Sequence, residues 1–292
     1  MNLRHLRSLV AIAESESFLA AAERLFVTPA AVSMQMKTLE AELQVALFDR
    51  TTRPPRLNAQ GLALIDKARD VLDSAEAFRE AAGALGELSG RLVIGSISGV
   101  TSDLLPQALA NLRRRHPRLV IRLEEGQSAP LSQRVLRREL DAAIVTQGPL
   151  PEPALASLPI LSEPMVVVTA QAAPDEDWRA VIASQPFLRI NRQSGMGILI
   201  DHTIRAAGLA PEDAMELDSS ETILQMAAAG LGAGVVPLGR ETQAHQAHLA
   251  VLPFGDPPVE RRVVLIQRAK SQRDHLAAVL VEELQALVAA ST

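Results

Sequence analysis

Three arginines, Arg50, Arg53 and Arg56, are spaced three residues apart around a turn formed by Pro54 and Pro55. Guanidinium groups repeated through a proline-rich turn are hard to bury in a core. They suit contacts with backbone phosphates or with the minor groove of DNA. The spacing therefore indicates a nucleic-acid contact, and the next question is which elements would hold this turn in place.

Two helices with a short break between them are predicted just before the turn. Ser17 suits the N-cap of a short first helix, and Thr28 suits the N-cap of a second. Proline is favoured at a first helical position, so we expect the second helix to run from Pro29 to Leu43. Apolar residues recur at helical spacings of three and four: Phe18, Ala21, Ala22 and Leu25 in the first helix, and Val32, Met36, Leu39 and Leu43 in the second.

The second helix is predicted to carry a polar face opposite this apolar stripe, with Ser33, Gln35, Lys37 and Thr38. Two helices in this order place a recognition helix in the major groove of DNA. A generic helical pair would show the same caps and stripe, so the arginine-bearing turn is what favours DNA binding over that alternative. The predicted DNA contacts are Thr28, Pro29, Ala30, Ser33, Gln35, Lys37, Arg50, Arg53 and Arg56.

A single long helix is predicted after the turn, from Asn58 to about Glu87. Asn58 suits its N-cap, and no glycine or proline interrupts it between Gly61 and Gly83. The many alanines in this segment permit close approach of another helix. The alternative is a surface helix of the following domain. A glycine- and serine-rich boundary at Gly83, Gly86, Ser89 and Gly90 is expected to act as a hinge.

From Arg91 onward, short apolar strands alternate with helical segments, which argues for a mostly parallel α/β sheet. Predicted strands include RLVIGSI, LVIRLEE, LDAAIV, PMVVVTA, GAGVVP and RRVVLIQR, and a helix is expected at residues 101–115. The pattern predicts two small α/β subdomains joined by two chain crossings, near residues 161 and 267.

Small polar residues follow several predicted strands. Ligands of open α/β sheets bind beyond the carboxyl ends of the strands, beside helix N-termini. Hydroxyls and free backbone N–H groups there favour an anion, and an arginine can pair with a carboxylate. The alternative is that these side chains merely cap helices. The predicted ligand contacts, which are effector contacts if the chain is a regulator, are Ser98, Thr101, Ser102, Ser128, Thr146, Arg192 and Ser194.

The chain resembles the LysR-type transcriptional regulators. The matching stretches are LRHLRSLVAIAESESFLAAAERL, TPAAVSMQMKTLEAEL and LFDRTTRPPRLNAQG, with weaker matches at RLVIGSI, LDAAIV, EPMVVV and MELDSSETILQMAAAGLGAGVVP. The chain departs from the family pattern where Pro29-Ala30 replaces a Gln-Pro pair and where Met34 replaces a basic residue.

The resemblance implies three parts: a winged helix-turn-helix DNA-binding domain at residues 1–60, a linker and dimerisation helix with a hinge at 58–90, and an effector-binding domain at 91–292. That last domain would resemble periplasmic binding proteins, with one subdomain of about 91–161 plus 268–292 and another of about 162–267. A small, anionic effector is expected between them.

The expected partners are double-stranded operator DNA, the effector, further copies of the chain as a homodimer or homotetramer, and RNA polymerase. The net charge of the chain is −5. Residues 1–60 hold seven Lys or Arg against six Asp or Glu, a difference of +1. Because one weakly basic module makes few phosphate contacts, more than one copy should be needed for tight binding.

Other function classes find little support in the sequence. There is no cysteine, so neither disulfides nor thiol chemistry are available. The chain has no Gly-x-Ser-x-Gly nucleophile motif, and His245 and His248 lack further ligands for a metal. We expect no enzyme activity, no cofactor, no membrane segment and a cytoplasmic location. The alternative function is a small-molecule-binding module or enzyme with an incidental helical N-terminal domain.

Overall fold

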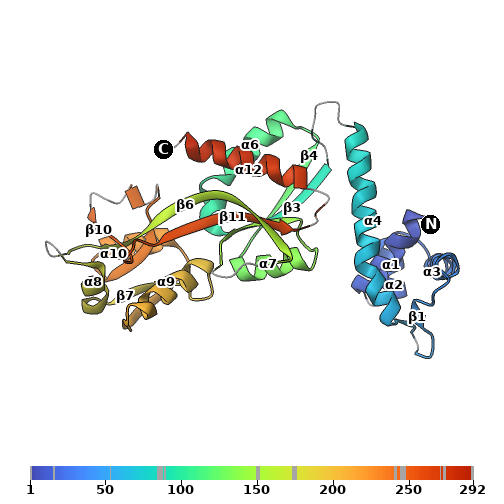
Figure 1. Ribbon diagram of the computed structural model, residues 1–292, viewed down its shortest axis with the longest axis horizontal. Coiled ribbons are helices and arrows are strands. Elements are labelled where there is room, and N and C mark those ends of the chain that lie inside the picture. The colour runs from blue at the N-terminus through green and yellow to red at the C-terminus, as the bar shows by residue number, and fades with distance from the viewer. Residues whose placement is uncertain are drawn as a thin grey trace. The chain divides into compact units, whose positions relative to one another are not determined.

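A computed structural model describes residues 2–15, 17–52, 54–83, 88, 90–148, 152–172, 176–239, 242–243, 248–269, 271 and 274–290. The chain divides into two compact units, residues 1–85 and 86–292. Figure 1 shows both units and labels many of their elements. No helix among the described residues combines the length and apolarity that a membrane span requires.

The first unit is helical, with one small sheet. Its helices are α1 (Leu3–Ser15), α2 (Phe18–Arg24), α3 (Pro29–Leu43) and α4 (Ala59–Gly83), and its two-stranded antiparallel sheet consists of β1 (Phe48–Asp49) and β2 (Arg56–Leu57). The core gathers apolar side chains from every helix, including Leu9, Ala21, Met36 and Ile65. This arrangement confirms the predicted helix-turn-helix with a β wing.

Local capping fixes where these helices begin. The Ser17 side chain accepts a hydrogen bond from the Ala20 N–H, and the Thr28 side chain accepts one from the Ala31 N–H. Asn58 Oδ1 accepts from the Gly61 N–H at 2.8 Å and so caps α4. Each contact satisfies an N–H group that the first helical turn leaves without a partner.

The second unit begins with a lobe that we call lobe I. It contains the parallel strands β3 (Gly90–Ser96), β4 (Leu119–Glu125) and β5 (Ala142–Thr146), with helices α5 (Ser98–Ser102), α6 (Leu105–Arg115) and α7 (Ser128–Leu136). Alternate residues of one strand face opposite sides of a sheet. Accordingly, Leu92 and Ile94 pack under α6 and the C-terminal helix α12 (Asp274–Ala289), while Val93 packs toward α7 on the other face (Figure 1).

Lobe II holds the middle of the unit. Its parallel strands are β7 (Phe187–Ile190), β8 (Asp213–Leu217) and β9 (Ala233–Pro237), and its helices are α8 (Trp178–Ser184), α9 (Gly195–Ala206) and α10 (Ser220–Ala228). Its core is a single buried cluster that includes Trp178 and Phe254, whose rings meet edge to face with centroids 4.9 Å apart.

Two long strands run from one lobe to the other. They are β6 (Leu155–Thr169) and β11 (Glu260–Arg268), which pair antiparallel from Pro164–Glu260 to Leu155–Arg268. The end of β6 then pairs with β9 and with β10 (Ala250–Pro253). The strand order through both lobes is β4-β3-β5-β11-β6-β9-β7-β8.

The first crossing lies near the predicted residue 161, because Ile160 packs in the core of lobe I and Met165 in that of lobe II. The return crossing lies between Phe254 in lobe II and Val263 in lobe I. The prediction of a return near residue 267 was therefore wrong. Residues 263–267 of the segment RRVVLIQR belong to lobe I, where they pair with β5.

Several element boundaries also differ from the sequence prediction. The helix expected at 101–115 is two helices, α5 and α6, with the break at Asp103–Leu104 just before Pro106 in the first turn of α6. The strand predicted at PMVVVTA begins nine residues before the predicted first residue, Pro164, at Leu155. Neither α8 nor β10 was predicted.

Candidate functional site

The exposed surface of α3 is the candidate DNA-reading surface. Ala30, Ser33, Met34 and Lys37 are all exposed, while Val32, Met36 and Leu39 are buried in the core. Thr28 and Pro29 lie at the exposed N-terminus of the helix, where Thr28 Oγ1 accepts from the Ala31 N–H at 3.2 Å. The N-terminal half of a recognition helix is the part that reaches base edges in this class of fold.

Gln35 departs from its predicted place on the free polar face. It is half-buried, and its Oε1 accepts a hydrogen bond from the Ser8 hydroxyl of α1. On a helix, position 35 lies three residues from Val32 and four from Leu39, which places it beside the buried stripe. Gln35 therefore joins α3 to α1 instead of pointing outward.

The wing arginines differ from one another. Arg50 is exposed, but its Nη2 lies 2.6 Å from Glu40 Oε2 of α3. Glu40 Oε1 also accepts the Leu47 N–H at 2.8 Å and the Phe48 N–H at 3.3 Å, so one carboxylate fixes the start of the wing. Arg56 is exposed on β2, whereas Arg53 lies outside the described residues.

One acidic residue of the wing is held in its charged form. The Thr51 hydroxyl and the Thr51 backbone N–H both donate to Asp49 Oδ1, and these bonds hold the pKa of the Asp49 carboxyl below its usual value. The wing therefore carries a carboxylate on β1, at the position that pairs with Arg56 of β2, which limits how basic this surface is.

A cavity of about 360 Å³ lies between the two lobes of the second unit. Five of the seven predicted effector contacts line it: Ser98, Ser102, Ser128, Thr146 and Ser194. They come from α5, from the N-terminal ends of α7 and α9 and from the end of β5, as expected for strand ends and helix N-termini. Residues that sequence reasoning missed also line it: Glu125, Asp218, Ser219, Ser220 and Arg261.

The two lobes touch at the centre of this region. Ser128 Oγ of lobe I accepts the Thr146 N–H at 3.2 Å, and Gly195 of lobe II packs against both residues. A second groove, of about 590 Å³, borders the same three residues together with Ile198, Leu199, His202, Glu260 and Arg262. The contact between Gly195 and Ser128 is thus shared by both hollows.

Arg261 is the basic side chain of the cavity that the prediction missed. It is 8% exposed, its Nε donates to Thr146 Oγ1 at 3.3 Å, and its Nη1 lies 3.4 Å from Glu163 Oε2. Buried charges in proteins are usually paired. The sequence offers no local signal for it, because Arg261 stands between the exposed charged residues Glu260 and Arg262 at the start of β11.

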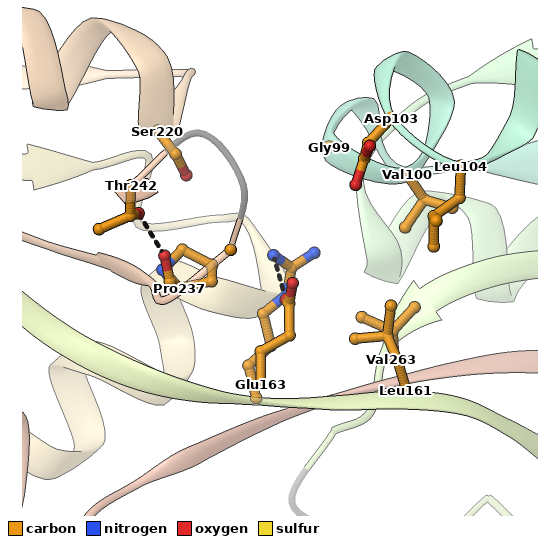
Figure 2. Close-up of a pocket in the computed structure, with 12 residues that line it drawn as sticks. Gly99, Val100, Asp103, Leu104, Leu161, Glu163, Ser220, Pro237, Thr242 and Val263 are labelled. Carbon is orange, nitrogen blue, oxygen red and sulfur yellow. Dashed lines mark hydrogen bonds and ion pairs between the residues drawn. The ribbon is translucent and has the colours of Figure 1, made fainter. Parts of the chain in front are cut away.

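Glu163 lies directly opposite Arg261 in the register of β6 and β11. It lines a smaller cavity beside the first, shown in Figure 2, where Val100 and Asp103 of lobe I stand on one side of it and Ser220 and Thr242 of lobe II on the other. Arg261 borders both cavities, so it stands where the two lobes and the crossing strands meet.

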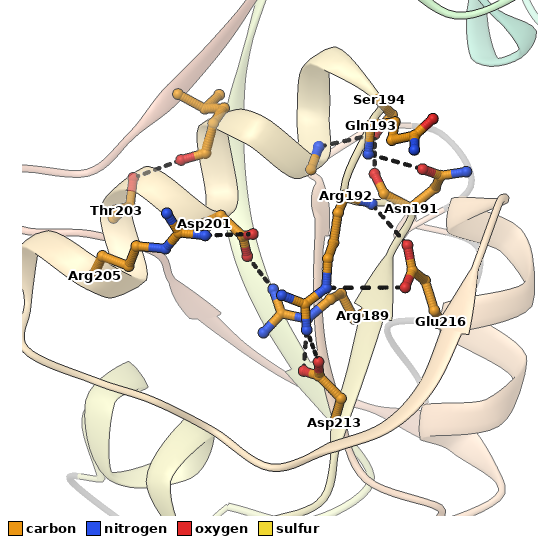
Figure 3. A network of polar contacts seen from close by, with 12 residues as sticks. Arg189, Asn191, Arg192, Gln193, Ser194, Asp201, Thr203, Arg205, Asp213 and Glu216 are labelled. Carbon is orange, nitrogen blue, oxygen red and sulfur yellow. Dashed lines mark hydrogen bonds and ion pairs between the residues drawn. The ribbon is translucent and has the colours of Figure 1, made fainter.

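Two predicted effector contacts do not line the cavity. Thr101 turns its hydroxyl back onto its own helix and donates to the Ile97 carbonyl at 3.1 Å. Arg192 pairs with Asp213 and lies 3.9 Å from Glu216 in an ion network of lobe II (Figure 3). The same network includes the buried Arg189, whose Nε lies 2.6 Å from Asp213 Oδ1. Arg192 therefore takes part in ion pairs at the surface of lobe II instead of lining the cavity.

A wing beside an exposed recognition helix, in one chain with a two-lobed α/β domain that encloses a polar cleft, defines a helix-turn-helix regulator with an effector domain. Two family models match the chain. "Bacterial regulatory helix-turn-helix protein, lysR family" covers residues 3–62, and "LysR substrate binding domain" covers residues 85–289. The chain belongs to the LysR family of DNA-binding transcription regulators, which are not enzymes.

Relatives of the chain match it along nearly its whole length. It is 32% identical to the hydrogen peroxide-inducible genes activator of Pectobacterium carotovorum subsp. carotovorum, over 98% of this chain and 97% of that protein. It is 31% identical to the DNA-binding transcriptional dual regulator OxyR of Escherichia coli (strain K12), over 93% and 90%.

Solved structures of related regulators also match the chain along nearly its whole length. A full-length OxyR from Pseudomonas aeruginosa, with one cysteine replaced by aspartate, superposes with a TM-score of 0.66 at 27% identity, covering 98% of this chain and 95% of that one. An H2O2-bound OxyR from Corynebacterium glutamicum, with one cysteine replaced by serine, gives a TM-score of 0.60 at 28% identity, covering 97% and 91%.

Proposed function

We propose that this regulator responds to a small acid that binds between lobes I and II. The observation that carries the proposal is Arg261, a buried guanidinium bonded to Thr146 at the edge of the cavity. The N-termini of α7 and α9 meet in the same cavity, and their first N–H groups attract an anion. The Ser128 hydroxyl accepts from Thr146 and keeps its own proton to donate.

The acid carries hydrogen-bond donors as well. The carboxylates Glu125 and Asp218 line the same cavity, so the site offers acceptors as well as donors. A ligand with a carboxylate and a hydroxyl or ammonium group satisfies both, as amino acids and hydroxy acids do. The cavity, about 360 Å³, falls at the low end of the usual range for small-molecule sites.

Thiol oxidation is not the signal in this proposal. The relatives named above include hydrogen peroxide-inducible activators, and the two solved structures named above carry substitutions at a cysteine. This chain contains no cysteine. A bound ligand that favours one arrangement of the lobes is the alternative means of shifting a regulator between states.

Operator binding in this proposal uses two or four copies of the chain, because a single weakly basic domain makes few phosphate contacts. The exposed apolar residues Val71 and Phe78 of α4 are seven positions apart and so lie on one helix face. They support self-association through α4. Leu72, by contrast, packs on the core of its own N-terminal unit.

The test of the effector site is a thermal-shift screen of the full-length chain against small carboxylic acids, including amino and hydroxy acids, each paired with its amide. A ligand that binds only the folded state raises the unfolding temperature. We expect an acid that stabilises the chain and an amide that does not. Arg261→Gln should abolish the shift, whereas Arg192→Gln, which changes an arginine outside the cavity, should leave it intact.

Equal ligand-induced thermal shifts in Arg261→Gln and Arg192→Gln would contradict an effector site at Arg261. Ser128→Ala, which removes a hydroxyl but no charge, provides a second readout if Arg261→Gln lowers stability by itself. Under conditions that spare methionine, hydrogen peroxide should leave the unfolding temperature in this assay unchanged. It should also leave the binding of DNA unchanged. A peroxide-dependent change in DNA binding under those conditions would overturn the ligand-based proposal.

A further inference from the structure

One stripe along the outward face of the recognition helix is apolar apart from one lysine. Ala30, Met34, Lys37 and Ala41 follow one another at spacings of three and four, so they lie along one face of α3. All four are exposed, and Met34 is 70% exposed. A long apolar side chain at the centre of this face has no structural role in the core of its own unit.

Three neighbouring polar side chains already make hydrogen bonds within the domain. Gln35 accepts from Ser8 of α1, the Thr38 hydroxyl donates to the Met34 carbonyl at 3.0 Å, and Thr28 caps the helix. On the N-terminal half of the helix, the outward side chains beyond the first turn are therefore Ser33, Met34 and Lys37. Met34 points most directly away from the buried stripe of Val32, Met36 and Leu39.

The chemistry of base edges offers one partner to the apolar side chain of Met34 on this surface. Guanine is read in the major groove by the forked donors of arginine or by lysine, and adenine by the paired donor and acceptor of asparagine or glutamine. Thymine presents a 5-methyl group, which apolar side chains contact. Methionine suits this contact because its unbranched thioether adapts to the shape of its surroundings.

We propose that Met34 contacts a thymine 5-methyl group in the major groove and that this contact helps this regulator to select its operators. The contact deepens the DNA-binding function of the helix-turn-helix domain. It does not depend on the effector or on the cleft between the lobes.

The experiment uses the full-length chain and DNA that differs only in methyl groups. Selection from a random pool of duplexes identifies a bound sequence, and that duplex is resynthesised with deoxyuridine at one thymine at a time. Deoxyuridine keeps base pairing and lacks only the 5-methyl group. For the wild type, we expect one thymine in each half-site at which the substitution weakens binding about fourfold, the loss that follows from exposing one methyl-sized apolar group.

The variant Met34→Ala tests whether that loss belongs to Met34. It should bind the thymine duplex more weakly than the wild type does, and at the sensitive position it should bind the thymine and deoxyuridine duplexes equally. Met34→Leu, which keeps an apolar side chain of similar size, should restore the preference for thymine. Lys37→Ala is the matched control on the same face, and it should weaken binding to both duplexes by the same factor.

Three results would overturn the proposal. They are a selected sequence without a thymine at any fixed position, a wild type indifferent to every deoxyuridine, and a Met34→Ala variant that still distinguishes the two duplexes as the wild type does. Because Met34 is exposed, its substitution should leave the unfolding temperature unchanged, and that measurement separates a lost DNA contact from a misfolded domain.

Discussion

Gly195 and Ser128, which begin α9 and α7 on opposite lobes, are packed so closely that a β-carbon on Gly195 would lie 2.8 Å from the Ser128 hydroxyl oxygen. The same β-carbon would lie 2.9 Å from Thr146 Cβ. Real β-carbons do not approach other atoms so closely, so this contact between the lobes requires a residue without a side chain.

Gly195→Ala should therefore hold the lobes farther apart at the cleft and weaken effector binding about tenfold, in keeping with the usual cost of inserting a methyl group into a packed contact. The measurement is the effector-dependent thermal shift of the full-length chain. The matched control is Gly148→Ala, since a β-carbon there would meet no atom within 4 Å. Equal affinities in the two variants would mean that the lobes need not approach at Gly195 to hold the ligand.

Glu40 is predicted to stabilise the DNA-binding unit through the start of the wing. Glu40→Ala removes the acceptor for two backbone N–H groups and the partner of Arg50. Unsatisfied groups of this kind cost about 1–3 kcal/mol each when buried, so the N-terminal unit should unfold at a lower urea concentration. Glu23→Ala, at an exposed position in α2, should change the urea midpoint of unfolding little. If Glu40→Ala unfolds at the same urea midpoint as Glu23→Ala, the wing is held by its apolar residues alone.

Substitution in α4 should separate self-association from folding. Phe78 is 77% exposed, so Phe78→Asp should leave the unfolding of the N-terminal unit unchanged and lower the particle mass measured by light scattering. Leu72→Asp should lower the stability of that unit itself, because Leu72 packs on its core. A Phe78→Asp variant with the wild-type mass would exclude this part of α4 from the interface between copies.

Arg53 is predicted to contact the phosphate backbone or the minor groove. Arg53→Ala should weaken binding to all duplexes alike and lower the slope of log affinity against log salt by about one contact. Arg192→Ala, which alters an arginine of the effector domain, supplies the reference for a change in net charge alone. A slope unchanged by Arg53→Ala would place that residue away from the DNA.

Much of the fold was predictable because the information is local. The caps at Ser17, Thr28 and Asn58 and the stripe of α3 each depend on residues a few positions apart. The strands of lobe I were predictable for the same reason, since their apolar runs are short and bounded by polar turns. The first half of β6 was not, because its residues alternate between exposed and partly buried positions and include Pro159.

The side-chain partners that define the sites were not predictable in this way. Gln35 is bound by a serine 27 positions away, and Arg261 reaches a threonine 115 positions away. Such pairs depend on the packing of whole elements, which one sequence does not encode as a spacing. The small polar residues at strand ends were predictable, because the topology of a parallel sheet brings those ends together.

The paired strands β6 and β11 limit how the effector domain can move. They are joined along nine register pairs, with one irregularity between Val263 and Val264, and they carry the chain between the lobes in both directions. A hydrogen-bonded ribbon keeps its width while it twists or flexes, and an irregularity of this kind increases the local twist. We therefore expect the lobes to rotate as two rigid bodies about the ribbon axis, so that ligands of different shapes all drive the domain along a single coordinate.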